Sequence, residues 1–253
     1  MLSKAKLKWI HSLEQKKIRT EYRLFTAEGN KLAEELLPLL SCRFLAATPQ
    51  WLSEHPGIRA EEVVEVSYDE LKKACLQTSP QGVLAVFRQP DSPLDWKEIA
   101  QSLCLALDNV QDPGNLGTIL RTADWFGIRH VFCSVGTADA WQPKTIQATM
   151  GSIGRVHVHY LRLEEVFEKA GLPVFGTFLE GEDIYRAELP DKGIILMGNE
   201  GKGISPELAA KVDRRLSIPS FASKGKGPES LNVSVAAAVV CSEFLRRQAP
   251  VGR

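Results

Sequence analysis

The sequence predicts an α/β protein made of two domains. Apolar, strand-like runs alternate with helical segments along nearly the whole chain, and a polar, proline-bearing stretch at 89–93 interrupts this alternation. A chain of 253 residues, 44% of them hydrophobic, is long enough to bury a core in each of two domains. We therefore place a smaller α/β domain at residues 1–92 and a larger one at residues 93–253.

The first domain is expected to be a small α/β unit. Strands are predicted at 22–25, 44–47, 63–66 and 82–87, with a helix at 28–40 between the first two. Thr48 followed by Pro49 is typical of a helix start, because threonine caps helices and proline suits the first helical position. Ser67 and Glu70 form a capping box, which predicts a helix from there to about Leu76.

The second domain repeats the alternation with longer segments. Apolar runs predict strands at 103–107, 130–134, 155–159, 174–178, 194–197 and 216–218, and helices are expected at 115–126, 143–150, 163–170, 206–212 and 231–245. Strands that alternate with helices indicate a mostly parallel sheet covered on both faces. Such folds bind ligands at the carboxyl ends of their strands, so we expect functional side chains in the loops that follow the strands.

Several function classes are excluded by composition. No apolar run approaches the ~20 residues needed to cross a bilayer, and the N-terminal segment lacks the apolar core of a secretory signal. The five cysteines are widely spread without a CxxC pair, which indicates reduced thiols rather than a disulfide or zinc framework. The five histidines are too scattered for a metal site, and His157 and His159 are expected to be structural residues on one face of a strand. We expect a cytoplasmic protein without a metal and without a membrane partner.

Charge is balanced overall but uneven locally. The 31 basic and 31 acidic residues cancel, which argues against a nonspecific polyanion binder. Residues 1–23 nevertheless carry seven basic and two acidic side chains, and residues 211–226 carry five basic and one acidic. Each patch is either solvated surface or a contact for a polyanion, and the presence of two favours the second interpretation modestly.

The first loop of interest runs from the strand at 103–107 into the next helix. Asn115 and Arg121 are six residues apart, which places them about 120° apart around a helix, near one end of it. Gly114 and Gly117 permit tight turning and close backbone approach. The simpler alternative is that Asn115 is only an N-cap and Arg121 an exposed helical arginine.

Two further loops carry similar signals. In Gly198-Asn-Glu-Gly-Lys-Gly, three glycines suit a loop wrapped against a ligand, although the pattern is neither a P-loop nor GxGxxG; Glu200 could pair with an arginine, bind a ribose, or lie in an ordinary turn. The third loop is basic and leads into a helix beginning Ser230-Leu-Asn-Val. Capping explains Ser230, but Asn232 is expected one step inside the helix, where asparagine is mildly unfavourable.

Together the three segments resemble the motifs of the SpoU (TrmH-like) family of RNA ribose 2′-O-methyltransferases, within the SPOUT superfamily. Those motifs are N-x-x-x-x-x-R, G-N-E-G-x-G and I-P…S-L-N-V-S-V-A, and the resemblance covers roughly residues 100–245. The stretch 25–31, FTAEGNK, is similar to the RNA-binding domain that often precedes this catalytic domain. In one departure, Ser220 replaces the usual methionine and the loop 221–229 is longer, either an RNA-contacting flap or a tolerated insertion.

The resemblance implies a fold, a cofactor and partners. The C-terminal domain would be a trefoil-knotted parallel-sheet SPOUT domain that binds S-adenosylmethionine, with an active site shared across a homodimer. The substrate would be the ribose 2′-hydroxyl of a structured RNA, more readily ribosomal RNA than transfer RNA. By motif position, the catalytic set is Arg121, Asn115, Glu200, Ser230 and Asn232, and the cofactor-binding set is Thr177, Gly198, Ile218 and Leu231.

The proton acceptor is not among the usual bases, because the three motifs contain no histidine or cysteine. Arg121 is a poor base, since guanidinium stays protonated. Either Arg121 is transiently neutral beside the sulfonium, or it holds the target phosphate while that phosphate or water takes the proton. The high pKa of the guanidinium group favours the second alternative. The rival functions are a noncatalytic RNA-binding homologue and, less well supported, a nicotinamide-dependent enzyme, which would need a GxGxxG after its first strand.

Overall fold

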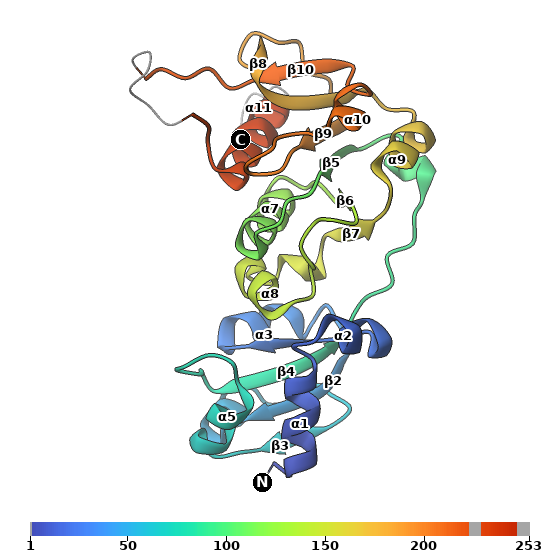
Figure 1. Cartoon of the computed structure of the whole chain (residues 1–253). Coiled ribbons are helices and arrows are strands. Elements are labelled where there is room, and N and C mark those ends of the chain that lie inside the picture. Colours follow the sequence, from blue (N-terminus) through green and yellow to red (C-terminus); the bar gives the residue numbers. More distant parts are fainter. Residues whose placement is uncertain (1, 223–228, 247–253) are drawn as a thin grey trace, which may run out of the picture. The chain divides into compact units, whose positions relative to one another are not determined.

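The computed structural model describes residues 2–222 and 229–246. Contacts between residues divide the chain into two compact units, whose elements are labelled in Figure 1. The first unit comprises the described residues of Met1–Asp91 together with Asp139–Arg155, and the second those of Ser92–Ala138 with Val156–Arg253. Both units combine helices with a sheet, which confirms the predicted α/β class.

The first unit is built on a four-stranded mixed sheet with the order β1-β4-β2-β3. Its strands are β1 (Leu24–Glu28), β2 (Cys42–Ala47), β3 (Val63–Glu65) and β4 (Val83–Arg88). β4 is antiparallel to both β1 and β2, whereas β3 is parallel to β2. Consequently β1, β2 and β3 run in the same direction, and their carboxyl ends share one edge of the sheet with the start of β4.

Short helices surround this sheet. They are α1 (Lys4–Ser12), α2 (Lys16–Tyr22), α3 (Asn30–Leu36), α4 (Pro49–Glu54), α5 (Tyr68–Ala74), α8 (Pro143–Thr149) and the 3-10 turn Ser152–Gly154. Both predicted helix starts are confirmed, since Thr48 caps α4 and Ser67 and Glu70 form the capping box of α5. α3 is shorter than predicted, because the buried Glu28 belongs to β1 and its carboxylate accepts the backbone N–H groups of Leu76 and Gln77.

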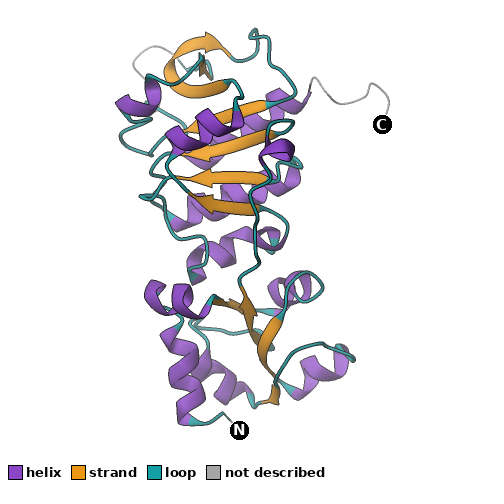
Figure 2. Ribbon diagram, turned by 90° about the vertical axis from the view of Figure 1, so that its right-hand side faces the viewer, coloured by secondary structure: helices purple, strands orange, loops and turns teal. Residues whose placement is uncertain are grey.

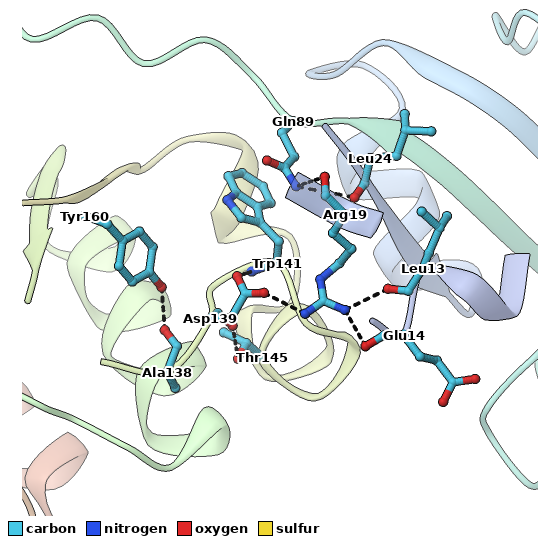
Figure 3. A network of polar contacts seen from close by, with 10 residues as sticks. All are labelled: Leu13, Glu14, Arg19, Leu24, Gln89, Ala138, Asp139, Trp141, Thr145 and Tyr160. Atoms are coloured by element: carbon cyan, nitrogen blue, oxygen red, sulfur yellow. Dashed lines mark hydrogen bonds and ion pairs between the residues drawn. The ribbon is translucent and has the colours of Figure 1, made fainter. Parts of the chain in front are cut away.

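The segment Asp139–Arg155 joins the first unit although it is distant in sequence. Arg19 is only 3% exposed, and its guanidinium donates to Asp139 Oδ2 at 2.6 Å and to the carbonyl oxygens of Leu13 and Glu14 (Figure 3). The ring of Trp141 packs against Phe25 with centroids 5.1 Å apart. The buried ion pair and this ring contact hold the segment within the unit.

The basic stretch at 1–23 is partly neutralised within the first unit. Lys6 pairs with Glu62 at 2.7 Å and Arg23 with Asp91 at 2.6 Å, while Arg19 is buried against Asp139. Lys4, Lys8 and Lys17 remain exposed on α1 and α2. The surface available to a polyanion is therefore smaller than the sequence suggests. In the second patch, Lys224 and Lys226 lie outside the described residues.

The second unit contains a six-stranded sheet with the order β10-β8-β9-β5-β6-β7. Strands are drawn in orange in Figure 2. Its strands are β5 (Leu103–Leu107), β6 (His130–Cys133), β7 (His157–Tyr160), β8 (Val174–Asp183), β9 (Gly193–Met197) and β10 (Arg214–Ser217). Every pairing between neighbouring strands is parallel, as predicted. β8 is longer than expected, because after its pairing with β9 it continues along β10 with a register shift between Arg215 and Leu216.

Helices cover both faces of this sheet. The helices are α6 (Trp96–Ile99), α7 (Pro113–Trp125), α9 (Leu163–Ala170), α10 (Pro206–Ala209) and α11 (Val233–Arg246). Side chains of α6, α9 and α10 pack with Cys104, Ala106 and Phe132 in one core cluster. On the other face, Phe244 of α11 meets Phe175 of β8 edge-on at 5.1 Å, and α7 packs against α11. Within the described ranges, each helix is too short or too polar to span a lipid bilayer.

His130 meets His157 and His159, which are distant from it in sequence, in the second unit. The sheet register pairs His130 with His157, and His130 Nδ1 lies 3.4 Å from His159 Nε2. Burial, followed by the neighbouring imidazoles of His130 and His157, lowers the pKa of His159 to about 4. His157 and His159 lie on one face of β7 as predicted. Among the described side chains, no group of three or more His, Cys, Asp or Glu residues is placed to hold a metal ion.

Candidate active site

The first predicted loop follows β5 and leads into α7. Asp112 caps this helix, since its Oδ1 accepts the Asn115 N–H at 2.9 Å, and Pro113 takes the first helical position. The N-cap role considered for Asn115 is thus filled by Asp112, which leaves the Asn115 side chain available at the helix start. Arg121 lies further along α7 with an exposed side chain.

The second predicted loop, 198–205, folds back on itself after β9. Asn199 and Gly203 exchange two backbone N–H···O bonds of 2.9 Å each, and Asn199 Oδ1 accepts the N–H groups of Gly201 and Lys202 at 3.0 Å. A Cβ at Gly198 would lie 2.3 Å from the backbone of Gly203, so only glycine fits there. The loop is therefore a closed turn, and its glycines allow the backbone to approach itself.

These two loops are fastened together at the edge of the sheet. Asn199 Nδ2 donates to the Asn109 carbonyl oxygen at 2.7 Å, and the Ser205 N–H donates to Asp108 Oδ2 at 2.7 Å. Asp108 is only 2% exposed. Neither Asp108 nor Asn199 was predicted from the sequence. The available signal for Asp108 was a carboxylate placed directly after a fully apolar strand, at the edge where ligands bind.

Glu200 connects the second loop to the start of α7. Its Oε1 accepts the Asp112 N–H at 3.2 Å and Asn115 Nδ2 at 3.1 Å, and its Oε2 accepts the Gln111 N–H at 3.3 Å. Burial alone would raise the pKa of Glu200, but the hydrogen bonds from Asn115 and from the backbone outweigh it and hold the pKa below its usual value. The carboxylate is thus ionised at neutral pH and acts as an acceptor for the first loop.

The third predicted segment meets the other two through Asn232. Its Oδ1 accepts the Ser234 N–H at 2.9 Å and the Ser234 hydroxyl at 2.6 Å, and its Nδ2 donates to Asn115 Oδ1 at 3.0 Å. The prediction that Asn232 lies inside a helix is wrong, because α11 begins at Val233. Asn232 precedes that helix as its cap, a position that asparagine favours.

One residue from each motif therefore forms a continuous chain of hydrogen bonds, Glu200–Asn115–Asn232. The sequence also assigns Arg121 and Ser230 to the site. Both are exposed, and neither makes a hydrogen bond or ion pair to Glu200, Asn115 or Asn232. The structure thus brings together three of the five residues predicted to be catalytic. Because all three are fixed by several partners, the start of α7 is held in place before any ligand arrives.

Two of the four predicted cofactor-binding residues directly follow strands, one lies within β8 and one precedes α11. Gly198 directly follows β9 and Ile218 directly follows β10, while Thr177 of β8 donates its hydroxyl to the Leu196 carbonyl oxygen at 3.1 Å. Leu231 precedes α11 and is 46% exposed, and Ile218 is half-buried. Gly198 is buried, so the partly exposed side chains of Ile218 and Leu231 are the surface that this set offers to a flat, largely apolar ligand. The intervening loop residues 223–228, part of the lengthened loop 221–229, lie outside the described residues.

Comparison with known proteins matches both units to described families. Residues 102–242 match the SpoU rRNA Methylase family, and residues 4–85 match the MRM3-like substrate binding domain. A Bacillus subtilis protein named 23S rRNA (guanosine(2553)-2'-O)-methyltransferase RlmP is 33% identical, over 93% of this chain and 94% of that protein.

Solved structures agree with this assignment. A TrmH-family protein from Porphyromonas gingivalis superposes with a TM-score of 0.87 and 44% identity, covering 98% of this chain and 99% of that one. An AdoMet-bound rRNA methyltransferase from Sinorhizobium meliloti superposes with a TM-score of 0.84 and 31% identity, covering 99% of this chain and 97% of that one. With its three motifs joined at Asn115, the chain belongs to the SpoU rRNA methylase family.

Proposed function

We propose that this protein transfers a methyl group from S-adenosylmethionine to the ribose 2′-hydroxyl of a nucleotide in ribosomal RNA. The observation that carries the proposal is the hydrogen-bonded chain Glu200–Asn115–Asn232, which joins one residue of each family motif. Residues 1–92 are the RNA substrate-binding domain and residues 93–253 the methyltransferase domain. The family matches at 4–85 and 102–242 and the rRNA 2′-O-methyltransferase named above support this division.

The predicted residues within β8 and directly after β9 and β10 fit the cofactor. S-adenosylmethionine, when bound, supplies an electrophilic methyl group on a positively charged sulfur. The partly exposed side chains of Ile218 and Leu231 offer apolar walls for an adenine ring, Thr177 offers a hydroxyl in β8, and the buried Gly198 allows the close turn after β9. The relative from Sinorhizobium meliloti, whose structure contains AdoMet, supports this assignment.

Arg121 is the residue that we assign to the substrate. It is a permanent cation, exposed on a helix whose start is fixed by Asn115. Arg121 holds the phosphate of the target nucleotide. Guanidinium stays protonated and cannot accept a proton, so that phosphate or a water molecule takes the proton of the 2′-hydroxyl. Ser230 lies beside Asn232 in sequence, and we assign it to the same site.

Assembly completes the proposal. Arg121 has no partner within the described part of its own chain, which supports an active site shared across a homodimer in which Arg121 of one subunit reaches the cofactor site of the other. The loops that follow β9 and β10 are the segments that we expect to form the trefoil knot. We assign the protein to the cytoplasm, because its five cysteines are free and buried and thiols stay reduced in that compartment.

The direct test is the transfer of labelled methyl from S-adenosylmethionine to total RNA that lacks the modification. Wild type should place label on ribose in ribosomal RNA, and Arg121→Ala should abolish it. Arg129→Ala, which alters an exposed arginine just before β6, should retain full activity. Label in transfer RNA would show that the substrate is transfer RNA. Tight RNA binding by wild type without any label would show that the protein is a noncatalytic RNA-binding homologue.

A second variant separates binding from chemistry. If Arg121 holds the phosphate, Arg121→Lys keeps a positive charge but loses the guanidinium geometry. It should therefore retain more RNA binding than methyl transfer, measured on the same RNA. Equal loss of both would contradict the assignment of Arg121 as a phosphate ligand.

A further inference from the structure

The first unit contains a cavity of about 530 Å³ at the carboxyl ends of its parallel strands. It is lined by Asn30 after β1, Thr48 and Trp51 after β2, Tyr68 after β3, and Gly82 before β4. Residues from every strand of the sheet therefore border one space. In open α/β sheets this edge is where ligands bind, because loops from several strands converge there.

Two buried polar atoms of this lining have no partner. The indole Nε1 of Trp51 and the Oδ1 of Asn30 are inaccessible to solvent, and neither makes a hydrogen bond within the described residues. Trp51 as a whole is only 2% exposed. An indole N–H can only donate and an amide oxygen can only accept. A buried donor and acceptor without partners destabilise the free protein, so their presence side by side in one cavity requires an explanation.

Gly82 places these two groups at one point of the cavity. A Cβ there would lie 2.8 Å from Asn30 Oδ1 and 2.9 Å from Trp51 Cδ1, so the backbone of Gly82 packs closely against both side chains. The φ angle of Gly82 is +36°, which side-chain-bearing residues rarely adopt. Glycine at the start of β4 therefore allows Asn30 and Trp51 to approach the same point of the backbone.

The remaining lining restricts the chemistry of the occupant. Glu54 contributes a carboxylate, and no lysine or arginine lines the cavity, so a phosphate group is disfavoured. Tyr68 is 49% exposed and offers a flat aromatic face. A planar, uncharged ring whose edge carries an acceptor beside a donor would stack on Tyr68 and satisfy both orphan atoms. The hydrogen-bonding edges of the nucleobases have this pattern.

We propose that this cavity binds a single unstacked nucleobase of the substrate RNA. Proteins that read single-stranded RNA commonly stack splayed-out bases on aromatic side chains and bond their edges. The inference rests on the proposed function, since it assigns the first unit a base-reading role toward the RNA that the second unit methylates. Contacts to phosphate by the exposed Lys17 of α2 would position the strand, whereas this cavity would read one base.

The first test observes Trp51 directly in the full-length protein. The chain has five tryptophans, so ¹⁵N-tryptophan labelling gives five indole resonances, and Trp51→Phe identifies that of Trp51. Single-stranded RNA hexamers of each base, and an abasic hexamer with the same backbone, serve as probes. We expect the Trp51 indole proton to move downfield on addition of base-containing hexamers, unequally among the bases, and to stay in place with the abasic one. The resonance of Trp9, in α1, should not move.

The second test measures methyl transfer to ribosomal RNA. Trp51→Phe, which keeps an aromatic ring but removes the donor, and Asn30→Ala should each raise KM for RNA about tenfold, while the Kd for S-adenosylmethionine stays the same. Trp9→Phe, a matched substitution in the same unit, should leave KM unchanged. Such a split between RNA and cofactor would not result from general loss of folding.

Two outcomes would overturn the proposal. An equal shift of the Trp51 resonance with the abasic hexamer would show that only the backbone binds. No shift at hexamer concentrations that saturate binding, together with equal KM values for Trp51→Phe and Trp9→Phe, would show that ordered water alone satisfies the two atoms. If wild type transfers no methyl group, the proposed function fails, and the resonance titration still decides whether the cavity binds a base.

Discussion

The two units treat polar groups at their strand ends in opposite ways. In the second unit the chain itself satisfies them: Glu200 accepts three hydrogen bonds from the first loop, and the buried Asp108 accepts from Ser205 and Asn109. In the first unit, Asn30 Oδ1 and Trp51 Nε1 are left without partners beside a cavity. Polar groups that bond within the chain hold a site in a fixed geometry, which catalysis requires. Polar groups without partners are stabilised only when a ligand forms hydrogen bonds with them.

The largest expected effect tests the buried ion pair of the first unit. Asp139→Ala leaves the buried Arg19 guanidinium without its carboxylate, so it should lower the free energy of unfolding by about 3–5 kcal/mol. Asp91→Ala breaks the exposed pair with Arg23, in which the side chains are 86% and 56% exposed, and should cost less than about 0.5 kcal/mol. Urea denaturation of the two variants checks the contrast. Equal losses would mean that burial does not set the strength of these pairs.

The next effect concerns the satisfied framework of the second unit. Glu200→Gln replaces one acceptor oxygen by an NH₂ group, which cannot accept the backbone N–H groups of both Gln111 and Asp112. We expect methyl transfer to fall about a hundredfold, because the start of α7 loses its fixed position. Glu207→Gln, an exposed glutamate in the first turn of α10, is the matched control and should keep wild-type activity. Full activity of Glu200→Gln would mean that the network is dispensable.

A smaller effect depends on pH and on the histidine cluster of the second unit. The pKa of His159 is about 4 in the folded protein, below the ~6.5 of an unfolded histidine, because burial disfavours its charged form. Between these values the unfolded chain binds the proton and the folded protein does not. The stabilising contribution is therefore complete above pH 6.5 and is lost as pH falls towards 4, by about 2–3 kcal/mol.

Thermal unfolding at pH 7.5 and pH 5 measures this contribution. His159→Gln should reduce the drop in Tm between the two pH values relative to wild type, because glutamine takes up no proton. His11→Gln, at an exposed position in α1, should leave the drop unchanged. An unchanged drop in His159→Gln would assign the acid sensitivity to other groups.

The smallest expected effect concerns the unbonded indole N–H of Trp51 in the first unit. Trp51→Phe removes a buried donor that bonds nothing in the free protein, so the free energy of unfolding should change by less than about 0.5 kcal/mol or rise slightly. Urea denaturation without RNA provides the measurement. A loss above about 2 kcal/mol would show that the indole N–H is already bonded in the free protein, and the contrast between the two units would disappear.

Local signals in the sequence predicted the elements well. The caps at Thr48 and Ser67 depend only on near neighbours, and the helix Leu163–Ala170 was predicted to the residue, because apolar periodicity marks its buried face. The three motifs also placed Asn115, Glu200 and Asn232 in one site before their contacts were visible. Their catalytic and cofactor-binding roles, and those of Arg121 and Ser230, stay predictions until the variants are measured.

Contacts between distant residues were beyond the sequence. The bond between Asp108 and Ser205 spans 97 residues and that between Arg19 and Asp139 spans 120, and no periodicity reports such pairs. The second half of β8 was missed because its exposed, polar residues do not form an apolar run. Asn232 was misplaced because helix boundaries predicted from pattern vary by a few residues, and that shift alone turned a cap into an interior position.

The segment Asp139–Arg155 has a consequence for how this protein can be cut or recombined. It lies inside the 102–242 family match, yet its contacts belong with Met1–Asp91, so the chain passes between the units three times. A fragment ending at residue 92 would lack Asp139 and leave Arg19 buried without its counterion. Neither unit can therefore be exchanged between relatives as one continuous segment. An exchange of the N-terminal part would also require the exchange of Asp139–Arg155.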